Sequence, residues 1–88
     1  MNLSNRIVTS ENRVRLLVSF LTNRPLTRRE VMAMIGLRDR KSFYELYVLP
    51  SFEMGYIEYT IPNKPNSRLQ KYRLTDKGRA LASSAHKR

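Results

Sequence analysis

Two basic segments of this sequence hold residue types that bind phosphate groups and base edges. The first is "LRDRKSFYEL", residues 37–46, whose candidate contacts are Arg38, Arg40, Lys41 and Tyr44. The second is "IPNKPNSRLQKYR", residues 61–73, whose candidates are Lys64, Asn66, Arg68, Lys71 and Arg73. Guanidinium and ammonium groups pair with phosphate oxygens, and they also fit the O6 and N7 atoms of guanine. Both segments therefore favour nucleic-acid binding.

Residues suited to catalysis or metal binding are scarce in the chain. The sequence has no cysteine, and its one histidine, His86, lies in "SSAHKR" next to the C-terminus. A serine nucleophile needs a base held beside it, and a zinc site needs a cluster of Cys and His ligands. We therefore expect no enzyme activity, no metal and no cofactor.

The chain as a whole is strongly basic, with 17 Lys and Arg, seven Asp and Glu, and a net charge of +10. This balance favours a polyanionic partner, usually nucleic acid and sometimes an anionic membrane surface. The alternative is that the charge serves solubility alone, as in many small bacterial domains. No apolar run approaches the roughly 18 residues that span a bilayer, and no signal peptide is visible. We expect a bacterial, cytoplasmic protein that does not bind membranes.

A first helix is predicted over residues 11–22. Apolar residues recur there at helical spacing from Val14 to Leu21, and Ser10 is a plausible N-cap. Asn23 and Pro25 end the helix. Residues 1–9 are weakly patterned, so we expect them to form a lead-in.

A second helix is predicted over residues 28–35. Thr27 followed by Glu30 is a capping-box pattern, and Gly36 suits the left-handed residue that ends a helix. Its predicted inward residues are Val31, Met34 and Ile35. Arg28 and Arg29 begin this helix and are candidate phosphate contacts, although they also suit an ordinary charged surface.

A third helix is predicted to begin after Asp39. Pro50 lacks the N–H that a helix needs, so we expect either a kink or a stop near Val48. By spacing, the inward face holds Phe43, Leu46 and Tyr47. The outward face holds Arg40, Lys41, Tyr44, Glu45 and Val48. Of these, Glu45 would repel phosphate.

A β-hairpin and a short last helix follow. Apolar residues alternate from Ile57 to Ile61 and again at Tyr72 and Leu74, on either side of the loop 62–68. The alternation places Tyr59 and Tyr72 inward as core aromatics rather than as base-stacking residues. Glu58 shares a face with Lys71 and Arg73, so part of that charge is expected to pair across the strands. Thr75 should cap a helix over residues 76–85.

This order of elements predicts an α+β fold of the winged helix-turn-helix class. It has three helices, a two-stranded hairpin as the wing and a short C-terminal helix. The domain is expected to span residues 10–85, with a basic tail at 86–88.

Residues 36–81 resemble the C-terminal winged-helix domain of Fic-family proteins and of RecG-like regulators. The shared pattern is DRxxFxxxYxxP, then a Gly-apolar-Ile-Glu turn, then IPxKPxSxxQKYRLTxKG. In this chain the pattern begins at Asp39 and ends at Gly78. The resemblance implies a DNA-binding or regulatory module. Fic enzymes transfer AMP with a His-Pro-Phe motif and a glycine-rich anion loop, and neither occurs in this chain.

The sequence thus predicts double-stranded DNA binding, with the third helix in the major groove and the wing on the flanking backbone. Recognition could be sequence-specific or dominated by the backbone. The alternative is a protein-interaction or dimerisation domain. Such a domain could be a homodimer or the accessory tail of a larger Fic-like or ATP-binding protein.

Overall fold

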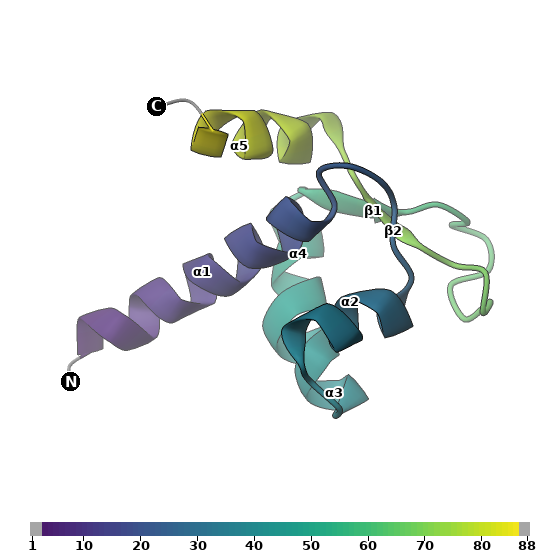
Figure 1. The fold of residues 1–88 in the computed structure, drawn as a ribbon, viewed down its shortest axis with the longest axis horizontal. Coiled ribbons are helices and arrows are strands. Elements are labelled where there is room, and N and C mark those ends of the chain that lie inside the picture. The colour runs from purple at the N-terminus through teal and green to yellow at the C-terminus, as the bar shows by residue number, and fades with distance from the viewer. Residues whose placement is uncertain (1–2, 87–88) are drawn as a thin grey trace.

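The structure is a computed structural model that describes the backbone of residues 3–86 and the side chains of residues 11–84. Its elements in chain order are α1 (Leu3–Phe20), α2 (Arg28–Ile35), α3 (Arg40–Phe43), η1 (Tyr44–Val48), α4 (Leu49–Glu53), β1 (Ile57–Tyr59), β2 (Tyr72–Leu74) and α5 (Asp76–His86). Because α3, η1 and α4 follow one another without a break, they form one helix, called the long helix below (Figure 1). This α+β arrangement confirms the predicted winged helix-turn-helix fold.

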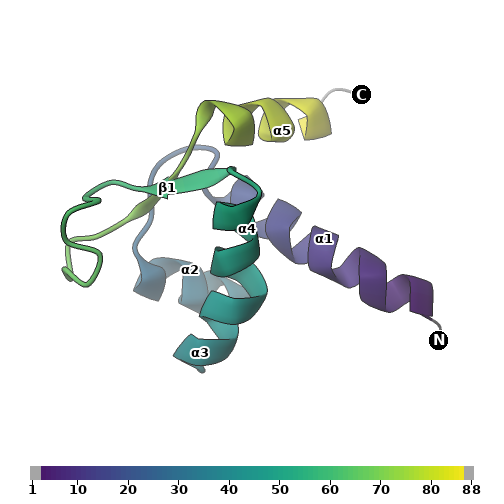
Figure 2. The ribbon, with the colours of Figure 1, turned by 180° about the vertical axis from the view of Figure 1, so that it is seen from behind.

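The first helix, α1, is longer than predicted, because it begins at Leu3 rather than near Glu11. Residues 3–10 contain neither Gly nor Pro, so nothing there stops a helix, and Ser10 lies inside α1 instead of capping it. Residues 3–9 of the predicted lead-in are therefore helical, and their end of α1 projects beyond the other elements (Figures 1 and 2). Residues 1 and 2 of the lead-in and 87 and 88 of the predicted tail lie outside the described residues. No helix within residues 3–86 is both long and apolar enough to cross a membrane.

The second helix, α2, has the predicted caps at both ends. The capping box of Thr27 and Glu30 is present, and Gly36 ends the helix with φ of 84°. Its inward face differs from the prediction, because Met32 is buried whereas Met34 is 53% exposed. At about 100° per residue, Met32 and Ile35 lie on the same side of Val31, and Met34 lies on the other side.

The long helix begins at the predicted N-cap, Asp39, but its inward face is not the predicted one. Val48 is fully buried, whereas Leu46 is 40% exposed, which reverses their predicted places. The cause is the π-helical turn η1, in which the Leu49 N–H donates to the carbonyl of Tyr44, five residues earlier. The extra residue brings Val48 onto the inward face, and the wider turn accommodates Pro50 without ending the helix.

The sheet is antiparallel, with Ile57 opposite Leu74 and Tyr59 opposite Tyr72. The segment before α2 also pairs with β2, on an isolated bridge outside the two strands. Leu26 and Tyr72 exchange backbone hydrogen bonds of 3.1 and 2.8 Å there. The sequence did not predict this pairing, because a single bridge residue has no alternating pattern. It fixes the start of α2 to the wing.

The junction between β2 and α5 is tightly packed. Thr75 Oγ1 accepts from the N–H of Gly78 at 3.0 Å and donates to the carbonyl of Gly55 at 2.6 Å. A Cβ atom on Gly78 would lie 2.1 Å from the carbonyl oxygen of Tyr56, so only glycine fits there. These contacts hold the hairpin against the end of the long helix.

Candidate nucleic-acid interface

A groove of about 600 Å³ lies between the start of α2, the start of the long helix and the wing loop, residues 60–71. Its basic side chains come from all three segments: Arg28, Arg29, Arg40 and Arg68. The described residues that line it include no Asp or Glu. The groove therefore concentrates positive charge without an acidic group to neutralise it.

The groove brings together about half of the residues that the sequence proposed as contacts. Those that line it are Arg28, Arg29, Arg40, Tyr44, Asn66 and Arg68. Those that are exposed but lie outside its lining are Arg38, Lys41, Lys64, Lys71 and Arg73. The second group does not line the groove, so any contact that its members make with a ligand uses another part of the surface.

The capping box sets the positions of Arg28 and Arg29 at the first turn of α2. The Thr27 N–H donates to Glu30 Oε1 at 2.8 Å, and the Glu30 N–H donates to Thr27 Oγ1 at 3.1 Å. The hydrogen bond from the Thr27 N–H lowers the pKa of Glu30, and the charges of Arg24 and Lys71 act in the same direction. The Glu30 carboxylate is thus held by the cap and stays outside the groove lining.

Asp39 sets the position of Arg40 in the same way at the start of the long helix. Its carboxylate accepts from the Ser42 hydroxyl at 2.6 Å and from the N–H groups of Lys41 and Ser42 at 3.3 Å. The bond from the Ser42 hydroxyl is the main cause of the lowered pKa of Asp39. Asp39 thus fixes the first turn of the long helix, from which Arg40 lines the groove.

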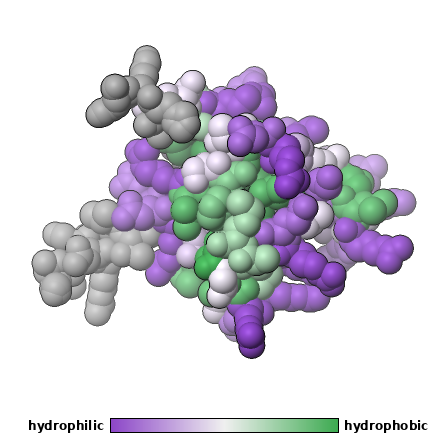
Figure 3. Space-filling view, viewed as in Figure 1, coloured by the Kyte–Doolittle hydropathy of each residue, from purple (hydrophilic) through white to green (hydrophobic). Residues whose placement is uncertain are grey.

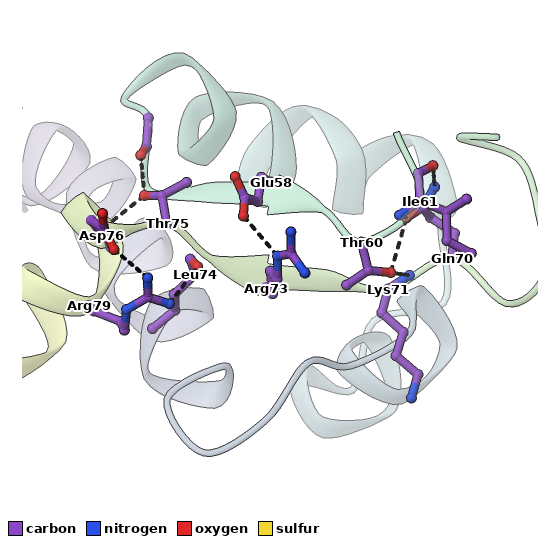
Figure 4. Close-up of polar contacts among 12 residues, drawn as sticks. Glu58, Thr60, Ile61, Gln70, Lys71, Arg73, Leu74, Thr75, Asp76 and Arg79 are labelled. Atoms are coloured by element: carbon purple, nitrogen blue, oxygen red, sulfur yellow. Dashed lines mark hydrogen bonds and ion pairs between the residues drawn. The ribbon is translucent and has the colours of Figure 1, made fainter. Parts of the chain in front are cut away.

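The wing loop is folded by three successive turns around one buried side chain. The N–H groups of Lys64, Ser67 and Gln70 each donate to the carbonyl three residues earlier, at 3.0 Å. Gln70 is 8% exposed, and its side-chain amide bonds to the backbone of Ile61 (Figure 4). It also bonds to the carbonyl of Lys64. The loop is therefore ordered before any ligand arrives, which lowers the entropic cost of binding.

The charges on the strand β2 side of the wing are not equivalent. Arg73 Nε lies 2.8 Å from Glu58 Oε2, which confirms the predicted cross-strand pair (Figure 4). Lys71 lies opposite Thr60, whose hydroxyl accepts from its backbone N–H, and no ion pair joins Lys71 to Glu58. Since Glu58 offsets the charge of Arg73, we rank Arg73 below Lys71 as a phosphate contact.

Sequence reasoning missed the role of Gln70, which places the wing against the groove. The resemblance pattern contained it, but its hydrogen bonds join residues six and nine positions apart and leave no local spacing signal in the sequence. Other residues of the same pattern are structural. Lys77 Nζ, for example, donates to the carbonyl of Met54 at 2.7 Å and lies over the Tyr56 ring. These residues of the pattern thus stabilise the hairpin and its packing against the end of the long helix.

Together, the helix-turn-helix, the hairpin wing and the basic groove between them define a winged helix-turn-helix domain. Residues 12–75 match the sequence model of the family described as "Filamentation induced by cAMP protein Fic-like, C-terminal domain". The chain belongs to this family.

A solved structure supports the same family. The chain is similar to the crystal structure of a Fic family protein from Desulfovibrio desulfuricans G20, with 30% sequence identity and a TM-score of 0.69. The similarity covers 82% of this chain and 23% of that protein, so the chain corresponds to less than a quarter of its length. No curated protein matches the chain.

Proposed function

We propose that this domain is a non-enzymatic module that binds double-stranded DNA in the cytoplasm. The α3 end of the long helix would enter the major groove, and the wing loop would lie on the flanking backbone. One observation carries the proposal: four arginines from three separate segments line one groove that holds no described carboxylate.

The four arginines are also available for binding. The ion pairs among described side chains join Arg15 to Glu11, Arg24 to Glu30, Arg73 to Glu58 and Arg79 to Asp76. None of them uses an arginine of the groove. An unpaired guanidinium can bind phosphate without first losing an acidic partner, and each bound phosphate releases condensed counterions.

The placement of Arg40 and Lys41 suits contacts with base edges and with the neighbouring phosphates. Both are exposed in the first turn of the long helix, where winged-helix domains approach base edges. Arg28, Arg29 and Arg68 lie on the two sides of the groove and suit phosphates of the strand between helix and wing. Most of the candidate residues would contact the phosphates of the DNA backbone rather than base edges, so we expect only a moderate preference for one DNA sequence over another.

The proposal is tested by the salt dependence of binding to a fluorescent duplex, measured by anisotropy between about 50 and 200 mM salt. Six neutralised phosphates predict a slope of log affinity against log salt near −5, because each contributes about −0.9. Undetectable binding at the lowest salt concentration would disprove the proposal.

A second candidate function is docking onto another protein domain, such as a neighbouring domain of a Fic-like or ATP-binding protein, or a second copy of the chain. Two observations favour it. The matched Fic family protein is more than four times as long as the matched part of this chain. Large apolar side chains are also exposed on α1, α2 and η1, namely Leu16, Met34 and Leu46. Figure 3 shows hydrophobic side chains gathered on the face between α1 and α2.

The two functions use different surfaces and can be separated. Replacing Arg40 and Lys41 with Ala should abolish DNA binding and leave assembly unchanged if DNA is the ligand. Replacing Leu16 and Met34 with Ser should instead change the sedimentation behaviour of the chain, alone or with a partner domain, if docking is the function.

A further inference from the structure

Three tyrosines line the groove, and each comes from a different element. Tyr44 belongs to η1, Tyr59 to β1 and Tyr72 to β2. The rings of Tyr59 and Tyr72 stack with centroids 5.9 Å apart, and Tyr72 also lies 6.3 Å from the ring of Phe43. The rings of Tyr59 and Tyr72 are thus held by the core, as the sequence predicted, and both residues also line the groove.

The hydroxyl groups of these tyrosines have no hydrogen-bond partner among the described residues. Tyr72 is only 7% exposed, so an enclosed hydroxyl would need a partner. However, no buried side-chain oxygen within the described side chains lacks a partner. The Tyr72 hydroxyl must therefore have some contact with solvent, and Tyr72 lines the groove.

The hydroxyls of Tyr59 and Tyr72 remain protonated and so act as hydrogen-bond donors. Burial, with smaller effects of Tyr59 and Tyr44, raises the pKa of Tyr72 to about 12, while Arg28 acts in the opposite direction. Burial also raises the pKa of Tyr59, again with Tyr44 as a neighbour. The residues that line the groove therefore combine the neutral hydroxyls of Tyr59 and Tyr72 with the cationic donors of the arginines.

We propose that the groove floor holds one phosphodiester strand, and that the hydroxyls of Tyr44, Tyr59 and Tyr72 donate hydrogen bonds to its phosphate oxygens. Arg28, Arg40 and Arg68 supply the charge around the same strand. This inference rests on the proposed DNA binding and deepens it, because it assigns a ligand contact to two tyrosines that otherwise serve only the core.

The inference has a signature that charge effects do not share. Counterion release depends on the number of cations that meet phosphates, so removing a neutral hydroxyl leaves the salt slope unchanged. Loss of a hydrogen bond to a charged group weakens binding by about tenfold or more. The variant Tyr44→Phe/Tyr59→Phe/Tyr72→Phe should therefore bind the duplex at least about tenfold more weakly at every salt concentration, with the wild-type slope.

The chain offers a matched control. Tyr47 and Tyr56 do not line the groove, so the variant Tyr47→Phe/Tyr56→Phe should bind the duplex as the wild type does. Circular dichroism reports whether each variant is folded. The single variant Tyr44→Phe changes a 43% exposed side chain, so it keeps the inference testable if the triple variant does not fold.

The possible results separate this inference from the proposed function. If the wild type binds DNA and the folded triple variant, or Tyr44→Phe in its place, binds equally well, the inference is wrong and DNA binding stands. A changed slope of log affinity against log salt in the triple variant would also overturn the inference, because the number of cations that meet phosphates would then have changed. If the wild type does not bind the duplex at all, both proposals fail.

Discussion

The side chain of Gln70 and the backbone of Ile61 form two hydrogen bonds that run in opposite directions. The Ile61 N–H donates to Gln70 Oε1 at 2.8 Å, and Gln70 Nε2 donates to the Ile61 carbonyl at 2.5 Å. A third bond joins Nε2 to the carbonyl of Lys64 at 2.9 Å. One amide thus ties together the two ends of the wing loop, which carries Arg68.

Replacing Gln70 with Ala should loosen the wing loop without unfolding the domain. The Ile61 N–H loses its partner, whereas the carbonyls of Ile61 and Lys64 each keep the bond from a loop N–H, so the loss of unfolding free energy should be about 1–3 kcal/mol. Hydrogen exchange of the Ile61 amide should become faster. Leu69→Ala is the control, because Leu69 is adjacent but 70% exposed. Unchanged exchange at Ile61 in Gln70→Ala would show that the amide does not hold the loop.

Replacing Gly78 with Ala should destabilise the whole domain. The added Cβ would meet the Tyr56 carbonyl at 2.1 Å, and both groups belong to backbone that other hydrogen bonds hold in place. Overpacking of this kind costs about 1–3 kcal/mol of unfolding free energy, measured by urea denaturation. Ser83→Ala, an exposed position in the same helix, should change it by less than about 0.5 kcal/mol. Equal stabilities of the two variants would contradict the close approach.

The π-helical turn predicts losses of stability of different size at Val48 and Leu46. Val48→Ala empties a fully buried site and should lower the unfolding free energy by about 2 kcal/mol. Leu46→Ala changes a side chain that is 40% exposed and should cost much less. A uniform α-helix would reverse this order, because Leu46 rather than Val48 would share the face of Phe43.

The carboxylate of Glu30 predicts a loss of stability in acid. Its pKa in the folded chain is below the usual value of 4.5, so an unfolded chain binds the proton more readily. The stabilisation is complete above about pH 4.5 and is lost as the pH falls through the folded pKa. Glu30→Gln keeps an acceptor for the capping box but cannot titrate. The difference between its stabilities at neutral and acid pH should be smaller than in the wild type, and identical pH profiles would contradict this cause.

Local signals in the sequence predicted much of this fold. Thr27 with Glu30, Asp39 and Gly36 mark helix ends through contacts within a few residues, and such contacts are encoded locally. The inward face of the long helix was not predictable by regular spacing, because η1 adds a residue to one turn. The pairing of Leu26 with Tyr72 was missed for a different reason. It is a single bridge between segments far apart in the chain, so it leaves no alternating pattern in the sequence.

The candidate site was predicted in its residue types but not in its shape. Arg28, Arg40 and Arg68 were identified by charge and by their places on helix starts and on a loop. Their convergence depends on the Leu26 bridge and on Gln70, which are tertiary contacts. A pattern that assigns a tyrosine ring to the core also says nothing of where its hydroxyl emerges.

The central claim is that the groove, rather than net charge alone, binds DNA. The most direct test compares Arg40→Ala with Arg15→Ala on the same duplex across the salt range. Both variants remove one positive charge, but Arg40 lines the groove and Arg15 is paired with Glu11 on α1. We predict that Arg40→Ala weakens binding by about tenfold and lowers the steepness of the salt slope by about 1, whereas Arg15→Ala stays near the wild type. Equal losses in the two variants would contradict the claim.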